Sequence, residues 1–244
     1  MEYADWAPRY REIQSTFGFP FEKEELSARR LVELLPEDAR KDPLNRIGQR
    51  LAGRTVVVVG QAPRLDAPPL WKLPPEDPRP ALMAADGATL RCLEGGLIPD
   101  VVTTDLDGPV ASEVAANARG SLVAVHAHGD NLAEIERWVP EFGGELSGSW
   151  AGPPRDGLFD VGGFTDGDRA AYLAEHVGAR RVLLWAFDFE QVDEAESAPR
   201  KLEKLAWARR LILELAEHGR ASIWNWAPDG TLHRYGGSAS PSTQ

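Results

Sequence analysis

The chain has 244 residues, of which 43% are hydrophobic, and its net charge is −11 because 38 acidic side chains outnumber 27 lysines and arginines. This charge argues against nucleic-acid binding, which needs a basic surface to displace counterions. No stretch is long and apolar enough to span a membrane, the N-terminus lacks the pattern of a signal peptide, and the single cysteine, Cys92, excludes an intrachain disulfide. We therefore expect a cytoplasmic protein with neither a membrane nor a nucleic-acid partner. The sequence does not decide between a monomer and a homodimer.

The N-terminal part of the chain is predicted to be helical and rather polar. Four apolar residues recur there at helical spacing: Trp6, Tyr10, Ile13 and Phe17. A second amphipathic series runs over Glu24–Leu35 and ends at Pro36. We interpret residues 1–50 as an N-terminal helical cap, followed by an α/β catalytic domain over 51–235 and a disordered tail over 236–244.

Beyond this cap, short apolar runs alternate with helical stretches, which is typical of a parallel sheet with crossover helices. The predicted strands are Thr55–Val59, Ala81–Ala85, Val101–Thr104, Ser121–His126, Leu158–Val161, Arg181–Phe187 and Ala221–Trp224. The predicted helices are Ala88–Gly95, Val110–Asn117, Leu132–Val139, Asp168–Val177 and Lys201–His218. A proline-rich loop over Ala62–Pro80 is either a lid or a long connection without a functional role. The expected fold is a doubly wound, mostly parallel, Rossmann-like α/β sheet.

Polar residues follow nearly every predicted strand, and in an open parallel sheet ligands bind at these carboxyl ends. The segments in question are Gly60, Asp86–Gly87, Asp105–Gly108, His126–Asn131, Gly162–Asp168, Asp188 and Asn225. One such ending is commonplace, because strands must turn. A full row of them along one edge favours a binding site.

Asp105 and Asp107 are the leading candidates for a metal site and for catalysis. Two carboxylates two residues apart point the same way if the segment is extended, and hard oxygen ligands suit Mg²⁺. The alternative is an Asp-Gly turn that closes the strand. Asp86 and Asp130 at the same edge favour the metal interpretation. A metal between carboxylates and phosphates would also allow an acidic protein to hold a polyphosphate.

The segment from Thr165 to Asp168 predicts a helix start with a capping box, in which Asp takes the place of Glu or Gln. The cap does not require Asp166, and helix N-termini also attract phosphate. Because two carboxylates would repel a bare phosphate, we expect Asp166 and Asp168 to act as supporting ligands of a bridging metal.

The segment His126–Asn131 is polar where a strand gives way to a helix. A His-x-His pattern suggests zinc, but the single cysteine and the surrounding carboxylates favour a hard cation. One histidine is expected to contact phosphate or substrate, and either an aspartate or His128 is the candidate general base. The alternative is that Asp130 or Asn131 simply caps the next helix.

Neither a dinucleotide fingerprint nor a P-loop follows the first strand. Gly60 allows a close backbone approach to a ligand. Lys201 and Lys204 share one face of the last helix and can reach phosphates, although solvated lysines are the ordinary state of a helix surface.

Four blocks together resemble the archaeal-type 6-hydroxymethyl-7,8-dihydropterin diphosphokinases, the MptE-like family. They are Ala84–Ala88, Ile98–Gly108, His126–Asn131 and Gly163–Ala170, and the resemblance extends from about Val56 to Asn225. The family is similar in its core to thiamine pyrophosphokinases. The resemblance implies Mg²⁺, ATP as co-substrate, and transfer of its β,γ-diphosphate to a hydroxymethyl pterin with release of AMP, in folate or methanopterin biosynthesis.

The residues expected to contact the nucleotide or its metal lie in these blocks, in the loop after the first strand and on the last helix. They are Gly60, Arg64, Asp86, Gly87, Asp130, Asn131, Thr165, Lys201 and Lys204. The loop Gly60–Asp66 departs from the family pattern Gly-x-Gly-Pro-Ser-Leu-Asp, because its second glycine and its serine are replaced, and Arg64 can itself meet phosphate. Two alternatives stay open: a thiamine pyrophosphokinase, and a nucleotide-sensing module without turnover.

Overall fold

Eight strands form one sheet in the part of the chain that the computed structural model describes, which is residues 3–62, 80–190, 198–227 and 231–236. The strand order is β5-β4-β3-β2-β1-β6-β7-β8, and every neighbouring pair is parallel except β7 with β8. The strands are β1 (Thr55–Val59), β2 (Ala81–Ala85), β3 (Val101–Thr104), β4 (Leu122–Ala127), β5 (Leu146–Trp150), β6 (Arg181–Trp185), β7 (Ser222–Trp226) and β8 (Leu232–Arg234). The order reverses at β1, which is the switch point where ligands bind in such sheets.

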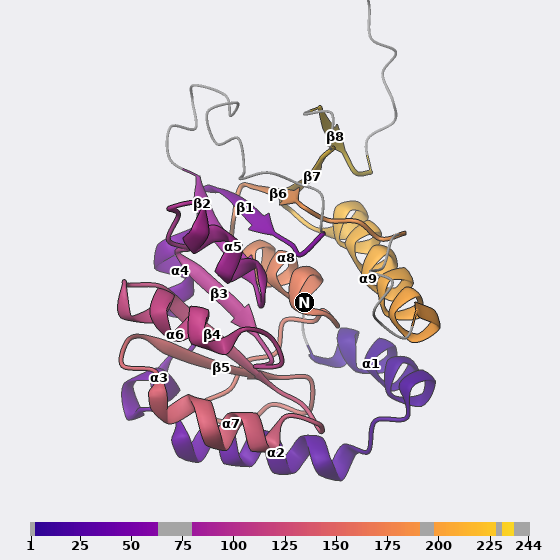
Figure 1. The fold of residues 1–244 in the computed structure, drawn as a ribbon. Helices are drawn as coiled ribbons and strands as arrows, with labels where there is room; N and C mark the ends of the chain where they lie inside the picture. The colour runs from indigo at the N-terminus through magenta and orange to yellow at the C-terminus, as the bar shows by residue number, and fades with distance from the viewer. Residues whose placement is uncertain (1–2, 63–79, 191–197, 228–230, 237–244) are drawn as a thin grey trace, which may run out of the picture.

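Helices cover both faces of the sheet (Figure 1). Along β1, Val56 and Val58 belong to one hydrophobic cluster and Val57 and Val59 to the other, so the pleat divides the core into two layers. The first layer includes residues of α1 (Tyr3–Phe17), α4 (Asn45–Leu51), α8 (Asp166–His176) and α9 (Ala198–His218). The second includes residues of α2 (Phe21–Leu34), α3 (Glu37–Lys41), α5 (Ala88–Glu94), α6 (Val110–Ala118), α7 (Leu132–Trp138) and the short 3₁₀ helix Val139–Glu141.

The N-terminal helices contribute to both layers of the core. Trp6 and Ile13 of α1 are buried in the first cluster, and Ala28 and Leu31 of α2 are buried in the second. Residues 1–50 thus pack on the same sheet as the rest of the chain. The division into a cap and a catalytic domain stays a prediction.

The doubly wound, mostly parallel α/β fold is confirmed, and one predicted strand is wrong. Leu158–Val161 forms only isolated bridges, from Leu158 to Arg155 and from Phe159 to Ser149, before the chain turns at Gly162 and Gly163 with φ values of 86° and 92°. One edge of the sheet is instead β5, and the other is the short β8; neither strand was predicted from the sequence.

No helix among the described residues is both long and apolar enough to cross a membrane. Most of the proline-rich loop and of the C-terminal tail (63–79 and 237–244) lies outside the described residues, as does Arg64.

Candidate functional site

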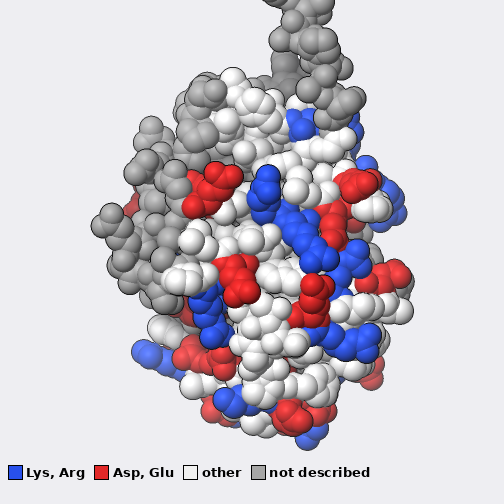
Figure 2. Space-filling view, turned by 90° about the vertical axis from the view of Figure 1, so that its right-hand side faces the viewer, with Lys and Arg blue, Asp and Glu red and all other residues white. Residues whose placement is uncertain are grey.

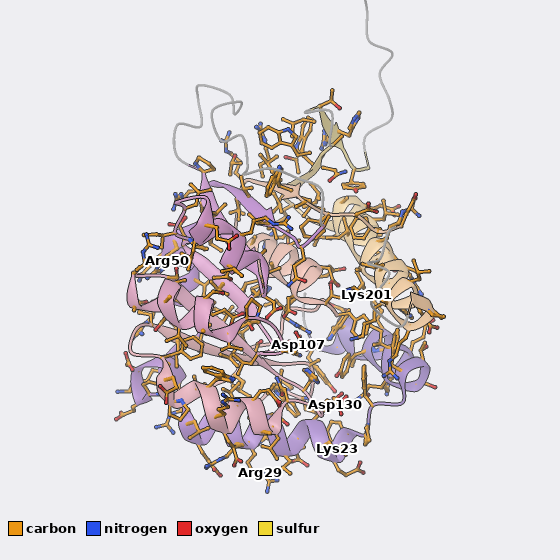
Figure 3. All side chains as sticks on the ribbon, in the orientation of Figure 1. Lys23, Arg29, Arg50, Asp107, Asp130 and Lys201 are labelled. Carbon is orange, nitrogen blue, oxygen red and sulfur yellow. The ribbon has the colours of Figure 1, made fainter. Side chains whose placement is uncertain are left out.

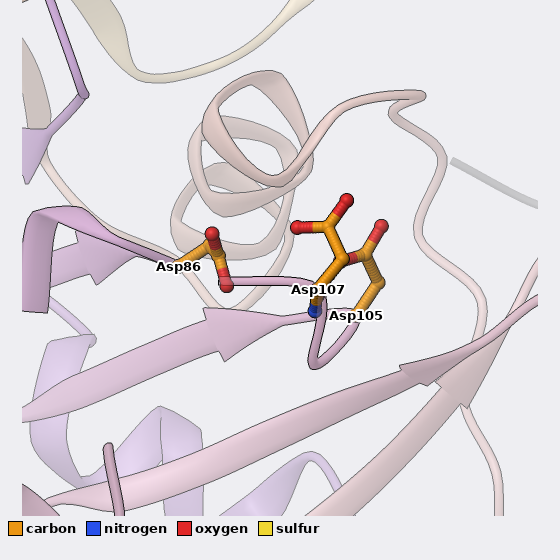
Figure 4. A group of neighbouring side chains, drawn as sticks. All are labelled: Asp86, Asp105 and Asp107. Carbon is orange, nitrogen blue, oxygen red and sulfur yellow. Dashed lines mark hydrogen bonds between the residues drawn. The ribbon is translucent and has the colours of Figure 1, made fainter. Parts of the chain in front are cut away.

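Three carboxylates meet at the carboxyl edge of the sheet. Asp86 follows β2, and Asp105 and Asp107 follow β3. One carboxylate oxygen from each lies within 4.8 Å of the other two (Figure 4). Hard oxygen donors at this spacing fit a divalent cation such as Mg²⁺, which is held by one or two carboxylates and completes its shell with water and phosphate oxygens.

The backbone around this group is strained. Among the described residues, the non-glycine residues with positive φ are Asp86 at 43°, Leu106 at 68° and Ala186 at 57°. Asp86 and Ala186 directly follow β2 and β6, and Leu106 lies two residues beyond the end of β3. Such conformations cost about 1–3 kcal/mol each and cluster at functional sites. The segment from Asp105 to Asp107 is therefore not extended, and that expectation is wrong. The turn at Leu106 nevertheless brings the two carboxylates together.

Asp86 is held in place by two side chains, one from the end of β3 and one from the loop that follows β1. Thr104 Oγ1 donates to Asp86 Oδ1 at 3.2 Å, and Gln61 Nε2 donates to Oδ2 at 3.0 Å. A Cβ on Gly108 would lie 2.3 Å from Asp86 Oδ2, so only glycine leaves room for this carboxylate. Asp86 is buried, and its orientation is fixed by these three neighbours.

The electrostatics of the group favour a bound cation. Burial raises the pKa of Asp105, but interactions with His128, Arg169 and Asp107, of which the hydrogen bond with His128 is the largest, outweigh it and lower that pKa to about 2. Partial burial and the charges of Asp105 and Asp86 raise the pKa of Asp107. A divalent cation would relieve the repulsion among the three carboxylates.

Basic and aromatic side chains face this group across a cavity of about 580 Å³. Its lining includes the three carboxylates, Arg200, Lys201 and Lys204 of α9, and the rings of Phe164, Phe187 and Phe189. Figure 3 shows Lys201 on α9 beside the edge where Asp107 lies. The cavity thus combines an acidic side, a cationic side and flat apolar walls.

The cationic side does not extend into a large basic surface. On the face that carries α1 and α9, basic side chains form a band interrupted by acidic ones (Figure 2). Basic residues of α1 and α9 are also paired with acidic ones, since Arg9 Nε lies 2.6 Å from Glu214 Oε2 and Arg210 Nη1 lies 3.4 Å from Glu12 Oε1. The basic residues of the cavity suit a small anion better than a polymer.

Comparison with known proteins shows the family to which the chain belongs. The family model described as 6-hydroxymethylpterin diphosphokinase MptE-like matches residues 29–194. The chain belongs to the MptE-like family. A 6-hydroxymethyl-7,8-dihydropterin pyrophosphokinase of Pyrococcus furiosus is 37% identical over 236 residues, which cover 91% of this chain and 98% of that protein.

Two further proteins of the same description are similar over nearly their whole length. The one from Methanothermobacter thermautotrophicus is 35% identical, covering 93% of this chain and 100% of its own. The one from Methanocaldococcus jannaschii is 32% identical, covering 91% of this chain and 95% of its own. Among solved structures, a protein from Lactobacillus plantarum aligns at 17% identity with a TM-score of 0.35, covering 71% of this chain and 61% of that one. A TM-score this low does not indicate a shared fold.

In this MptE-like chain the two predicted carboxylates at the start of α8 have different surroundings. Asp166 lines the cavity, and its Oδ1 lies 3.4 Å from Nη1 of the buried Arg169. Asp168 is fully buried, and its carboxylate accepts from the backbone N–H groups of Phe164 at 2.8 Å and Thr165 at 2.7 Å, and from Thr165 Oγ1. The predicted capping box is confirmed. The structure places Asp168 in this cap and not in the three-carboxylate group.

Replacing Asp168 by alanine is expected to lower the free energy of unfolding by about 2–4 kcal/mol, because two N–H groups lose their buried acceptor. Urea unfolding measures this loss. Asp5→Ala makes the same exchange at an exposed position in the first turn of α1 and is expected to cost under about 1 kcal/mol. Equal losses for the two variants would show that the cap contributes no special stability.

The segment His126–Asn131 wraps around Asp105. Asn131 Nδ2 donates to the backbone carbonyls of Asp105 at 2.7 Å and His126 at 2.8 Å, and Oδ1 accepts from the His128 N–H at 3.0 Å. Asn131 holds the N-cap position of α7 but makes no side-chain cap bond. Asp130 is exposed and lies outside the three-carboxylate group, on the side of α2 (Figure 3).

Two predicted glycines serve close packing within the chain. A Cβ on Gly60 would lie 2.5 Å from the Ala186 carbonyl oxygen, and one on Gly87 would lie 2.3 Å from Gln61 Nε2. Gly60 therefore brings the ends of β1 and β6 together at the switch point of the sheet. Several residues that the structure brings to the site are not among the predicted ones: Gln61, Thr104, Phe164, Arg169, Phe187, Phe189 and Arg200.

Proposed function

We propose that this chain is a 6-hydroxymethyl-7,8-dihydropterin diphosphokinase that uses ATP and Mg²⁺ and acts in the cytoplasm, in folate or methanopterin biosynthesis. The observation that carries the proposal is the three-carboxylate group facing α9 cations across one cavity, in a chain of the MptE-like family. In the reaction, the hydroxymethyl oxygen bonds to the β-phosphorus. The bond from that phosphorus to the oxygen on the α-phosphorus breaks, AMP leaves, and the hydroxyl proton is released.

The residues on each side of the cavity suit different parts of the two substrates. Asp86, Asp105 and Asp107 would hold Mg²⁺, which when bound neutralises charge on the phosphates. Lys201, Lys204 and Arg200 contribute positive charge from the opposite wall, and positioning with charge neutralisation is most of what phosphoryl-type transfer requires.

The aromatic walls suit a flat heterocycle. Phe187 and Phe189 have ring centroids 5.9 Å apart at an interplanar angle of 52°, and both line the cavity with Phe164. Adenine and the pterin are both flat rings that can pack against such walls. Both acceptors are alcohols on flat heterocycles, and thiamine differs from the pterin by the permanent positive charge of its ring.

Phosphorus NMR of a reaction with ATP, Mg²⁺ and hydroxymethyl-dihydropterin is the experiment that tests the proposal. We expect AMP and a diphosphorylated pterin to appear together, with a specificity constant far above that for thiamine. ADP with a monophosphorylated acceptor would instead indicate an ordinary kinase, and a higher value for thiamine would overturn the acceptor. ATP binding without turnover of any alcohol would identify a nucleotide sensor.

A further inference from the structure

Both ring nitrogens of His128 are engaged by the protein. Nδ1 accepts the backbone N–H of Asp130 at 3.3 Å, and Nε2 lies 3.2 Å from Asp105 Oδ2. A neutral imidazole carries one proton, and a nitrogen that accepts a hydrogen bond cannot carry it. The proton of His128 therefore lies on Nε2 and is donated to the Asp105 carboxylate.

The position of His128 is itself fixed. Its backbone N–H donates to Asn131 Oδ1 at 3.0 Å, while Asn131 Nδ2 donates to the backbone carbonyl of Asp105 at 2.7 Å. The same short segment thus holds Asp105 twice, by its backbone through Asn131 and by its carboxylate through His128. The ring of His126 stacks beside that of His128, with 6.4 Å between the two ring centroids. His126 Nδ1 in turn lies 3.0 Å from Ser149 Oγ.

Neither nitrogen of His128 is available to take a proton from the acceptor alcohol. A general base needs an unprotonated atom within hydrogen-bond reach of that proton. Nε2 carries a proton and points at Asp105, and Nδ1 points back at the segment that carries it.

We propose that His128 is a positioning residue, which orients the Asp105 carboxylate for the divalent cation and does not act as the general base. The inference rests on the proposed function in one respect, the assignment of Asp105 as a metal ligand. It replaces the expectation of a catalytic His128. Groups that orient a metal ligand in this way typically change metal affinity or activity by about 10–100-fold when they are removed.

Two replacements separate the roles. His128→Ala removes both the donor and any base, whereas His128→Gln keeps an amide N–H near the position of Nε2 but cannot accept a proton at neutral pH. The first readout is Mn²⁺ binding to the nucleotide-free protein by electron paramagnetic resonance. The second is turnover of the proposed substrates. The same exchanges at His218, an exposed residue near the end of α9, are the matched control.

We expect His128→Ala to weaken Mn²⁺ binding about 10–100-fold and His128→Gln to restore it to within about 10-fold of the parent, with turnover following the same order. Parental Mn²⁺ affinity in His128→Ala overturns the proposal, even if the glutamine variant fails to fold. A folded His128→Gln variant as impaired as the alanine variant overturns it as well. If the parent protein binds Mn²⁺ but transfers no diphosphate, the proposed function fails, while the binding measurements still decide the role of His128.

Discussion

Replacing Asp105 or Asp107 by asparagine is expected to reduce turnover by about 100- to 1,000-fold, the range typical for loss of one charge-stabilising group at a reacting centre. Each exchange keeps the size of the side chain and removes one charge from a group whose ligand atoms lie within 4.8 Å of one another. Initial rates of AMP formation at saturating ATP and pterin measure the effect.

The same two variants should keep their fold. Asp107 has its pKa raised partly by the charges of Asp105 and Asp86, so the carboxylates repel one another in the metal-free protein. Removing the Asp107 charge should therefore leave the melting temperature unchanged or raise it, as is usual for a strained functional site. Removing the Asp105 charge should lower the melting temperature modestly, because the lowered pKa of Asp105 means that the folded state stabilises this charge.

Asp156→Asn is the matched control for this pair, because Asp156 is exposed in a turn outside the cavity. It should turn over at the parental rate. Near-parental turnover of Asp105→Asn or Asp107→Asn would remove that residue from the metal site, and a large fall in melting temperature would make the loss of activity a folding effect.

The acidic pair was predictable because its signal is local. Two aspartates two residues apart at the end of an apolar run need only a strand before them and a turn after them, and the sequence contains both. The capping box at Thr165 is local in the same way, and it too could be predicted from a four-residue pattern.

The side chains that orient Asp86 were not predictable, because their roles depend on register. Val59 pairs with Ala84 and Ala85 pairs with Thr103, and only this alignment brings Gln61 and Thr104 to the same carboxylate. No local sequence pattern around Gln61 or Thr104 indicates that the residue contacts Asp86.

The edge strand β5 was missed for a related reason. Its residues, Leu146–Trp150, include two serines and a glycine, which have weak strand preferences. A Cβ on Gly148 would lie 2.5 Å from Leu158 Cδ2 and 2.6 Å from Leu35 Cδ1. Gly148 is therefore explained by the leucine side chains that pack against it. These contacts join residues far apart in the sequence, so they are seen only in the folded chain.

Gly108→Ala is expected to inactivate the protein by displacing a carboxylate while leaving the charge of the site unchanged. The added Cβ would lie 2.3 Å from Asp86 Oδ2 and 2.7 Å from Oδ1, far inside van der Waals contact. Asp86 is buried and held by Gln61 and Thr104, so its carboxylate can yield only by breaking those hydrogen bonds. We expect Mn²⁺ affinity to fall about 10–100-fold and turnover to fall at least as much.

Gly143→Ala provides the control, since it makes the same exchange where no atom lies within 4 Å of the new Cβ. Both variants should give the same far-ultraviolet circular dichroism as the parent. Mn²⁺ titration and AMP formation then separate them: only Gly108→Ala should lose both. Parental Mn²⁺ binding in a folded Gly108→Ala variant would show that the site tolerates a displaced Asp86. In that case the cation would depend on Asp105 and Asp107 alone, because these are the carboxylates of the group that the new methyl group does not displace.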